Sequence, residues 1–339
     1  MAAPSHAMDA VHCCRPQRGI PYGREKYGWT YATASGVCGQ CFVGAIVVVS
    51  GSAFPNEDFI GLGMERLPYI DRLLRELRGG APEARALFGR HIHLGYWSDP
   101  GQADGSFADF AAAAERLSWL VCEAGGVRDG QRILDVGCGI GGTLAALNES
   151  LSGLLLFGLN IDARQLEIAK ASVPARPSNQ VQFVVGNAGH LPFTERSFDV
   201  ITAVECSFHF PSRETFLREA KRVLRPGGML ALSDLVTDDD TALIGPLRRL
   251  LFPSQMRGPF YGKVDLSYAL QDYRAAARAA GLIAVSESDI TEQTSPTFPV
   301  VLEAMRQRRW RSASAETRLA KWFSLLRGVR YVVLSFQAA

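Results

Sequence analysis

The segment from Ile133 to Gly142 has the residue types and spacing of a ligand-binding turn. A short apolar stretch that contains Asp135 leads into a run with glycine at positions 137, 139, 141 and 142. Because glycine has no Cβ and tolerates positive φ, such a run lets the backbone approach a bound molecule closely. A strand, a glycine turn and a helix in succession bind cofactors at the carboxyl end of a parallel sheet. The sequence therefore predicts a cofactor site here.

Two kinds of cofactor fit this turn. Gly137, Gly139 and Gly142 match the spacing of dinucleotide-binding proteins, and Asp162 follows about 20 residues later, as that pattern requires. Asp135 favours a different ligand, because a buried carboxylate beside the turn is unfavourable next to a pyrophosphate. A carboxylate at this place suits a cationic or amine-bearing ligand.

Three motifs together resemble one enzyme family. The pattern Asp-x-Gly-x-Gly-x-Gly that ends at Gly141 resembles motif I of the class I S-adenosylmethionine-dependent methyltransferases. Residues 191–193 with 197–200, which read LPF and SFDV, and residues 222–230, which read RVLRPGGML, resemble two further signatures of that family. The resemblance extends from about Phe88 to Val236. It implies S-adenosylmethionine as the cofactor and methyl transfer as the reaction.

The resemblance also implies which residues contact the cofactor. Asn160 and Asn187 stand where the family usually has acidic residues for the ribose hydroxyls and the adenine amino group; an amide oxygen can still accept one hydrogen bond. Tyr96 and Trp97 resemble a segment that related enzymes fold over cofactor and acceptor. The expected cofactor contacts are Asp135, Gly137, Gly139, Gly141, Asn160, Ile161, Gln165, Asn187, Ala188 and Tyr96.

Methyl transfer to a hydroxyl or a carbon requires an oriented acceptor and a base. His209 follows the strand expected at 198–204 and resembles a histidine of sugar O-methyltransferases and phosphoethanolamine N-methyltransferases. We expect His209 to act as general base, Asp234 to orient it, and Glu205 to bind the acceptor or to help hold the cofactor. The alternatives are a structural histidine at 209 and a capping role for Asp234. His91 and His93 are too few for a metal site, and we expect none.

The acceptor is expected to be an apolar small molecule. Residues 237–266 form a predicted substrate lid, rich in apolar and aromatic side chains with basic residues between them. O-methylation of a natural product or sugar is favoured over C-methylation of a prenylquinol, terpenoid or prenyl diphosphate. A non-catalytic cofactor-binding protein is the alternative of another class. The sequence has no basic stripe interleaved with aromatic residues, so we expect no nucleic-acid partner.

Strand-like and helix-like patterns of apolar residues alternate along the chain and predict the elements that position these residues. With the resemblance, they predict an α/β, Rossmann-like, seven-stranded, mostly parallel sheet with helices on both faces and an antiparallel last strand. The expected strands are 132–136, 154–159, 181–185, 198–204, 228–235, 282–288 and 329–336. The expected helices are 65–77, 82–88, 107–124, 143–150, 163–171, 213–224 and 267–280.

The composition is that of an ordinary globular protein, with 339 residues, a net charge of +2 and 47% hydrophobic residues. Residues 1–63, which hold four of the seven cysteines, are expected to be a poorly structured extension, and a translation start at Met64 is an alternative. Residues 64–339 are expected to form one domain, with 64–124 as a helical cap. The scattered remaining cysteines indicate a cytoplasmic protein. We expect no membrane span, and a homodimer is left open.

Overall fold

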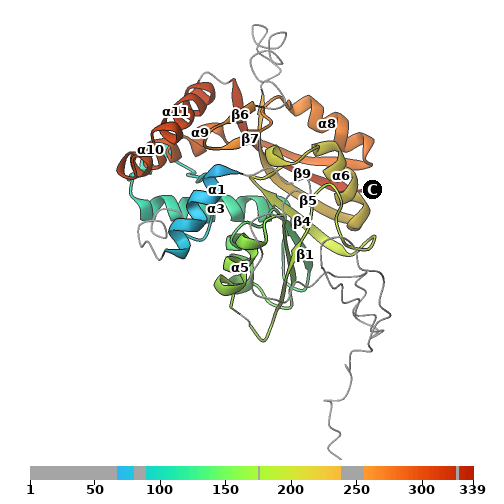
Figure 1. Ribbon diagram of the computed structural model, residues 1–339. Helices are drawn as coiled ribbons and strands as arrows, with labels where there is room; N and C mark the ends of the chain where they lie inside the picture. Colours follow the sequence, from blue (N-terminus) through green and yellow to red (C-terminus); the bar gives the residue numbers. More distant parts are fainter. Residues whose placement is uncertain (1–66, 80–88, 175, 238–255, 326–327) are drawn as a thin grey trace, which may run out of the picture.

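The computed structural model describes residues 67–79, 89–174, 176–237, 256–325 and 328–339 (Figure 1). The predicted extension at 1–63, the short helix at 82–88 and most of the predicted lid lie outside these ranges. None of the helices in the described ranges has the length and apolarity that crossing a bilayer requires.

A seven-stranded sheet forms the centre of the molecule, in the order β3-β2-β1-β4-β5-β9-β8. All its strands are parallel except β9, which runs antiparallel to both of its neighbours. The predicted fold class is therefore confirmed. The strands are β1 (Arg132–Val136), β2 (Leu155–Asn160), β3 (Gln180–Val185), β4 (Phe198–Val204), β5 (Leu224–Thr237), β8 (Leu282–Asp289) and β9 (Val329–Ala338).

Helices cover both faces because the central strands are apolar on both sides. These helices are α3 (Phe107–Ala124), α4 (Gly142–Ser150), α5 (Ala163–Ser172), α6 (Arg213–Val223) and α8 (Leu270–Ala279). In β1, Ile133 packs into the cluster beneath α3, α4 and α5, whereas the next residue, Leu134, packs into the cluster beneath α6 and α8. The helix α3, which we expected in a cap, packs against the sheet strands β4, β5 and β9.

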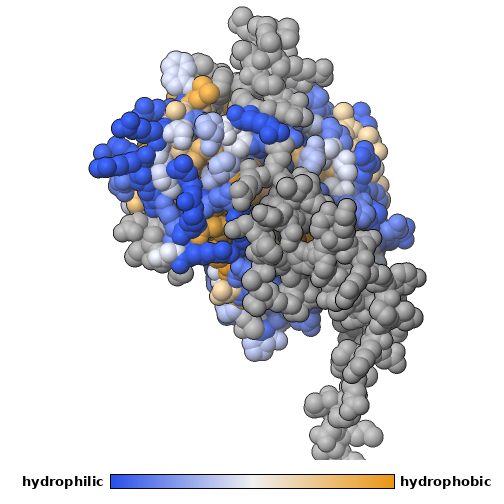
Figure 2. All heavy atoms as spheres, viewed as in Figure 1, coloured by the Kyte–Doolittle hydropathy of each residue, from blue (hydrophilic) through white to orange (hydrophobic). Residues whose placement is uncertain are grey.

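A second group of elements lies beside the carboxyl end of the sheet (Figure 1). It comprises α1 (Pro68–Arg78), the hairpin β6 (Met256–Gly258) and β7 (Gly262–Val264), α9 (Thr291–Thr294), α10 (Thr297–Gln307) and α11 (Arg311–Leu325). The helices α9, α10 and α11 were not predicted from the sequence. In α11 the apolar residues Leu319, Trp322 and Leu325 are exposed, which obscures the one-sided pattern of a surface helix. Hydrophilic side chains cover much of α10 (Figure 2).

The strand β5 begins earlier than predicted. Pro226 and Gly227, read as a turn between helix and strand, lie inside the strand, which starts at Leu224 directly after α6. The pairing of β4 with β5 shifts register between Phe198 and Val200, so this first part of β5 is irregular.

Candidate active site

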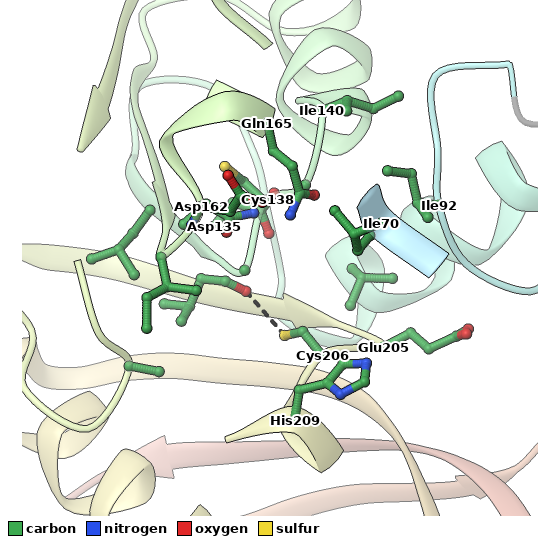
Figure 3. Close-up of a pocket in the computed structure, with 18 of the residues that line it drawn as sticks. Ile70, Ile92, Asp135, Cys138, Ile140, Asp162, Gln165, Glu205, Cys206 and His209 are labelled. Atoms are coloured by element: carbon green, nitrogen blue, oxygen red, sulfur yellow. Dashed lines mark hydrogen bonds between the residues drawn. The ribbon is translucent and has the colours of Figure 1, made fainter. Parts of the chain in front are cut away.

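A cavity of about 260 Å³ opens at the carboxyl ends of β1, β2, β3 and β4 (Figure 3). The glycine turn after β1 and the start of α5 form one side, where Asp135, Cys138 and Gln165 lie. The segment after β4 forms the opposite side, with Glu205 and His209. Ten of the predicted site residues line this cavity: Asp135, Gly137, Gly139, Asn160, Ile161, Gln165, Asn187, Ala188, Glu205 and His209. Cys206, which was not predicted as a site residue, lines it as well.

The glycine turn is compact because side chains would collide there. A Cβ on Gly137 would lie 2.7 Å from the Cys206 side chain, and its φ is +73°. A Cβ on Gly142 would lie 2.2 Å from the carbonyl oxygen of Arg90. The turn can thus carry the backbone along the cavity wall only with glycine at these positions.

Gly141 does not line the cavity, which differs from the expectation. It is the N-cap of α4, with φ +89°, and a Cβ there would lie 2.9 Å from Cβ of Ala169 on α5. This glycine therefore allows α4 and α5 to pack closely, and its contacts are with protein.

Asp135 is a buried carboxylate at the floor of the cavity. Its Oδ1 accepts a hydrogen bond from the Thr202 hydroxyl at 2.8 Å. Burial raises the pKa of Asp135 to about 7, and this hydrogen bond opposes the shift. A cation in the cavity would stabilise the ionised form of this group.

Asn160 is the last residue of β2, and Asn187 lies just after the end of β3, as predicted. Each side-chain oxygen accepts a backbone hydrogen bond, Asn160 from the Asp162 N–H at 3.0 Å and Asn187 from the Gly189 N–H at 2.8 Å. One lone pair of each oxygen is thus used to hold the loop. The second lone pair and the amide N–H groups are what each residue can offer to a ligand.

Glu205 has an uncommon backbone conformation, with φ +49° directly after β4. Its Oε2 accepts hydrogen bonds from the backbone N–H of Leu94 at 2.8 Å and from the Tyr331 hydroxyl at 2.6 Å. Burial raises the pKa of Glu205 to about 7. Two donors therefore hold this carboxyl group at the cavity wall.

His209 has a defined tautomer. Its Nδ1 lies 2.9 Å from the carbonyl oxygen of Lys263, which can only accept, so Nδ1 carries the proton. Nε2 then carries the ring's lone pair and accepts a hydrogen bond from the Tyr69 hydroxyl at 3.1 Å. Burial lowers the pKa of His209 to about 4, so the ring is neutral at pH 7. A neutral imidazole in this tautomer can take a proton at Nε2.

The predicted pair of His209 with Asp234 is not formed. Asp234 is fully buried, and its Oδ2 accepts a hydrogen bond from Nε of Arg213 at 2.6 Å and another from the Tyr273 hydroxyl. It does not line the cavity. An orienting role for Asp234 is therefore wrong, because Arg213 and Tyr273 use its carboxylate and the carbonyl of Lys263 orients His209.

Tyr96, which we expected to contact the cofactor, does not line the cavity. It packs with residues of α3 and β9, while its backbone N–H donates to the carbonyl of Ala113 at 2.9 Å. Trp97 is buried against Phe110. The part of this segment that reaches the cavity is 90–93.

His91 and His93 line the cavity but are bonded to protein. Nε2 of His91 lies 2.7 Å from Oε2 of Glu115, and its Nδ1 lies 3.1 Å from Nε2 of His93. Nδ1 of His93 lies 2.8 Å from the carbonyl of Leu94, and burial lowers the pKa of His93 to about 3. The two rings therefore fix the segment that covers the glycine turn.

A second cavity of about 110 Å³ adjoins the first. The two share Tyr69, Ile92, His93, Glu205 and His209. The rest of its lining is mainly apolar and aromatic, from α1, the β6–β7 hairpin and α10. Phe260 and Tyr261 belong to the predicted lid at 237–266 and line this cavity. The lining residues that were not predicted are Tyr69, Leu73, Met305, Arg308 and Trp310. For Tyr69 and Leu73 a signal existed, because they lie one helical turn apart on α1.

Comparison with known proteins identifies the family. Residues 134–232 match the family model described as a methyltransferase domain. Over 229 residues, the chain is 37% identical to the methyltransferase GfsG of Streptomyces halstedii, an alignment that covers 65% of this chain and 76% of the relative. The chain belongs to the class I S-adenosylmethionine-dependent methyltransferases. It is an enzyme that transfers methyl groups to small molecules. The interpretation of the glycine turn as a dinucleotide-binding site is therefore excluded.

Two further comparisons place this methyltransferase. It is 33% identical over 219 residues to the 27-O-demethylrifamycin SV methyltransferase of Amycolatopsis mediterranei, covering 64% of this chain and 75% of the relative. A cyclopropane synthase of Mycobacterium tuberculosis has the same fold, with a TM-score of 0.64 at 13% identity, over 81% of this chain and all of that one.

The cavity of the methyltransferase fits S-adenosylmethionine, which is the family's cofactor. A Cβ at Gly137 or Gly142 would crowd the turn along the cavity wall. The buried Asp135 carboxylate complements a ligand that carries a sulfonium and an ammonium group.

Proposed function

We propose that this methyltransferase transfers a methyl group to a hydroxyl oxygen of an apolar natural product. The observation that carries the proposal is the neutral His209, whose Nε2 lone pair lies where the two cavities meet. The cofactor binds in the larger cavity and the acceptor in the smaller one. Because the Amycolatopsis mediterranei relative acts on 27-O-demethylrifamycin SV, its name supports an acceptor of this kind. The homodimer and the cytoplasmic location remain predictions from the sequence.

The larger cavity offers groups for each part of the cofactor. Asp135 faces the positively charged amino-acid end, and the glycine turn leaves room for it. Asn160 and Gln165 bind the ribose hydroxyls, and Asn187 binds the adenine amino group. S-adenosylmethionine supplies a methyl group on a positively charged sulfur and loses that charge when the methyl leaves.

His209 takes the proton of the acceptor hydroxyl. A buried imidazole resists protonation, which is why the pKa of His209 is lowered to about 4. The histidine gains its positive charge in the step in which the sulfur loses one, so the total charge of the cavity is unchanged. The carboxyl group of Glu205, which lines both cavities, can accept a hydrogen bond from a polar group of the acceptor.

Tyr69 and His209 both line the two cavities and contact each other. The Tyr69 hydroxyl donates to Nε2 at 3.1 Å, and the Tyr69 ring stacks on the His209 ring with centroids 5.9 Å apart. Burial raises the pKa of Tyr69 well above its usual value, so it stays a donor at neutral pH. We place Tyr69 as a relay, in which its oxygen accepts the acceptor's proton while its own proton passes to Nε2.

Replacing Tyr69 with phenylalanine is expected to lower kcat at least about tenfold and to leave cofactor affinity unchanged. The ring and its stacking are retained, so only the hydroxyl is tested. Steady-state methylation rates and calorimetric titration with S-adenosylmethionine measure the two quantities. Tyr261→Phe is the control, because its hydroxyl bonds to Thr317. A raised KM with an unchanged kcat would show that Tyr69 only covers the acceptor.

Cofactor affinity is expected to decrease by up to about tenfold per pH unit below pH 7. In the free protein the pKa of Asp135 is raised to about 7, and a cationic ligand binds its ionised form, so binding at lower pH must release a proton. Calorimetry between about pH 5.5 and 7.5 tests this. Asp135→Asn should abolish the dependence. Glu205→Gln is the matched variant, because the pKa of Glu205 is also raised to about 7. If the pH dependence of cofactor affinity is lost in Glu205→Gln and kept in Asp135→Asn, the effect belongs to Glu205.

C-methylation is the second candidate. A carboxylate held in an apolar cavity, as Glu205 is, can stabilise the positive charge that develops on a carbon acceptor. The functional test is a mass-spectrometric screen of hydroxylated and unsaturated small molecules for transfer of an isotope-labelled methyl group. Products from hydroxylated compounds alone support O-methylation, whereas products from unsaturated compounds without a hydroxyl favour C-methylation.

A further inference from the structure

The acceptor cavity has a second polar region, apart from the residues that it shares with the cofactor cavity. Arg308, at the C-terminal end of α10, lines the acceptor cavity and not the cofactor cavity. Its side chain is only 12% exposed. A guanidinium in an otherwise apolar and aromatic wall has a strong need for hydrogen-bond acceptors.

Protein groups satisfy only part of that need within the described residues. Nε of Arg308 donates to Oε2 of Glu76 at 3.0 Å, and Nη1 donates to the carbonyl of Ala304 at 3.2 Å. Its guanidinium lies over the Trp310 ring, 5.8 Å from the centroid. A guanidinium has five N–H groups, so these bonds leave donors for a ligand.

The position of this group along the cavity follows from α1. Tyr69 and Glu76 are both on α1, seven residues apart, which corresponds to about 10 Å along a helix. Leu73 lies between them and lines the cavity. An acceptor whose hydroxyl reaches Tyr69 therefore extends past apolar side chains towards Arg308.

The charge of the ligand group follows from Glu76. Its carboxylate already neutralises Arg308, so a second anion would be repelled by Glu76 in a poorly solvated place. An uncharged oxygen, in a carbonyl or hydroxyl group, accepts from the guanidinium without that repulsion.

Resting on the proposed function, we propose that Arg308 determines acceptor specificity by donating hydrogen bonds to an uncharged oxygen of the acceptor, about 10 Å from the hydroxyl that is methylated. Glu76 is the partner that excludes anionic acceptors. An ion pair that merely ties α1 to α10 would also explain the contact, and the test separates these two roles.

The test measures binding of three rigid probes to the full chain saturated with S-adenosylhomocysteine, by calorimetry. The probes are para-phenylphenol, its analogue with a second hydroxyl at the far para position, and its analogue with a carboxylate there. We expect the second hydroxyl to tighten binding about tenfold, and the carboxylate to give no gain. Arg308→Met, which keeps an apolar stem, should remove the advantage of the second hydroxyl.

Glu76→Gln should make the carboxylate probe bind about tenfold more tightly, because it leaves the charge of Arg308 unbalanced. Arg306→Met, on the same helix but 76% exposed, is the control and should change nothing. If the three probes bind equally, if none binds, or if Arg308→Met and Glu76→Gln weaken all three alike, the proposal is overturned. Whether a bound probe is then methylated tests the proposed function separately.

Discussion

Replacing His209 with alanine is expected to lower kcat at least about a hundredfold and to leave the affinity for S-adenosylmethionine unchanged. The variant removes the Nε2 lone pair that faces the junction of the two cavities, while the glycine turn and Asp135 remain intact. Without a base, the acceptor oxygen must react as a neutral hydroxyl. Methylation rates at saturating cofactor and calorimetric titration measure the two effects.

His190→Ala is the matched control, because His190 is exposed and is absent from both cavity linings. It should retain full activity. Combining His209→Ala with Tyr69→Phe should cost little more than His209→Ala alone, since both act on one proton. Full activity in the His209 variant would remove the base assignment.

Breaking the buried ion pair between Arg213 and Asp234 is expected to lower the free energy of unfolding by about 3–5 kcal/mol. The side chains of Arg213 and Asp234 are 1% and 0% exposed, and Nε lies 2.6 Å from Oδ2. Arg213→Met leaves the Asp234 carboxylate without its cation, in a place that water does not reach. Denaturant unfolding measures the change, and Arg306→Met, which breaks an exposed pair with Glu303, should change it by less than about 1 kcal/mol.

Asp234→Asn separates a structural from a catalytic role. We expect lower stability and a nearly normal kcat for the folded fraction, because Asp234 does not line either cavity. A hundredfold loss of kcat with unchanged stability would restore Asp234 to the catalytic machinery.

The sequence predicted the sheet well because the relevant signals are local. The strand at 198–204 was predicted with its observed bounds, since a continuous apolar run in a parallel sheet is buried on both faces. The glycine turn and most cofactor-lining residues were found for the same reason. Each of these residues lies at the end of a strand, and the apolar pattern of the sequence predicts where that strand is. Residues at the ends of neighbouring parallel strands come together at one edge of the sheet, so their neighbours in space can be predicted too.

The acceptor site could not be predicted in this way, because its residues come together from distant parts of the chain. Tyr69 meets His209 across 140 positions, and Arg308 meets Glu76 across 232. The same limit explains the error at Asp234. Its place at the end of the predicted strand 228–235 suggested an orienting carboxylate, but its partners on α6 and α8 are set by tertiary packing that no local pattern encodes.

Methyl transfer to an oxygen, with His209 as the base, is tested most directly by product NMR with carbon-13 methyl-labelled S-adenosylmethionine. The probe is para-phenylphenol with a second para hydroxyl, in parallel with the compounds that the screen yields. We predict one new methyl resonance in the methoxy region, formed at least about a hundredfold more slowly by His209→Ala. A resonance of a methyl group on carbon, or an unchanged rate in that variant, would contradict the account.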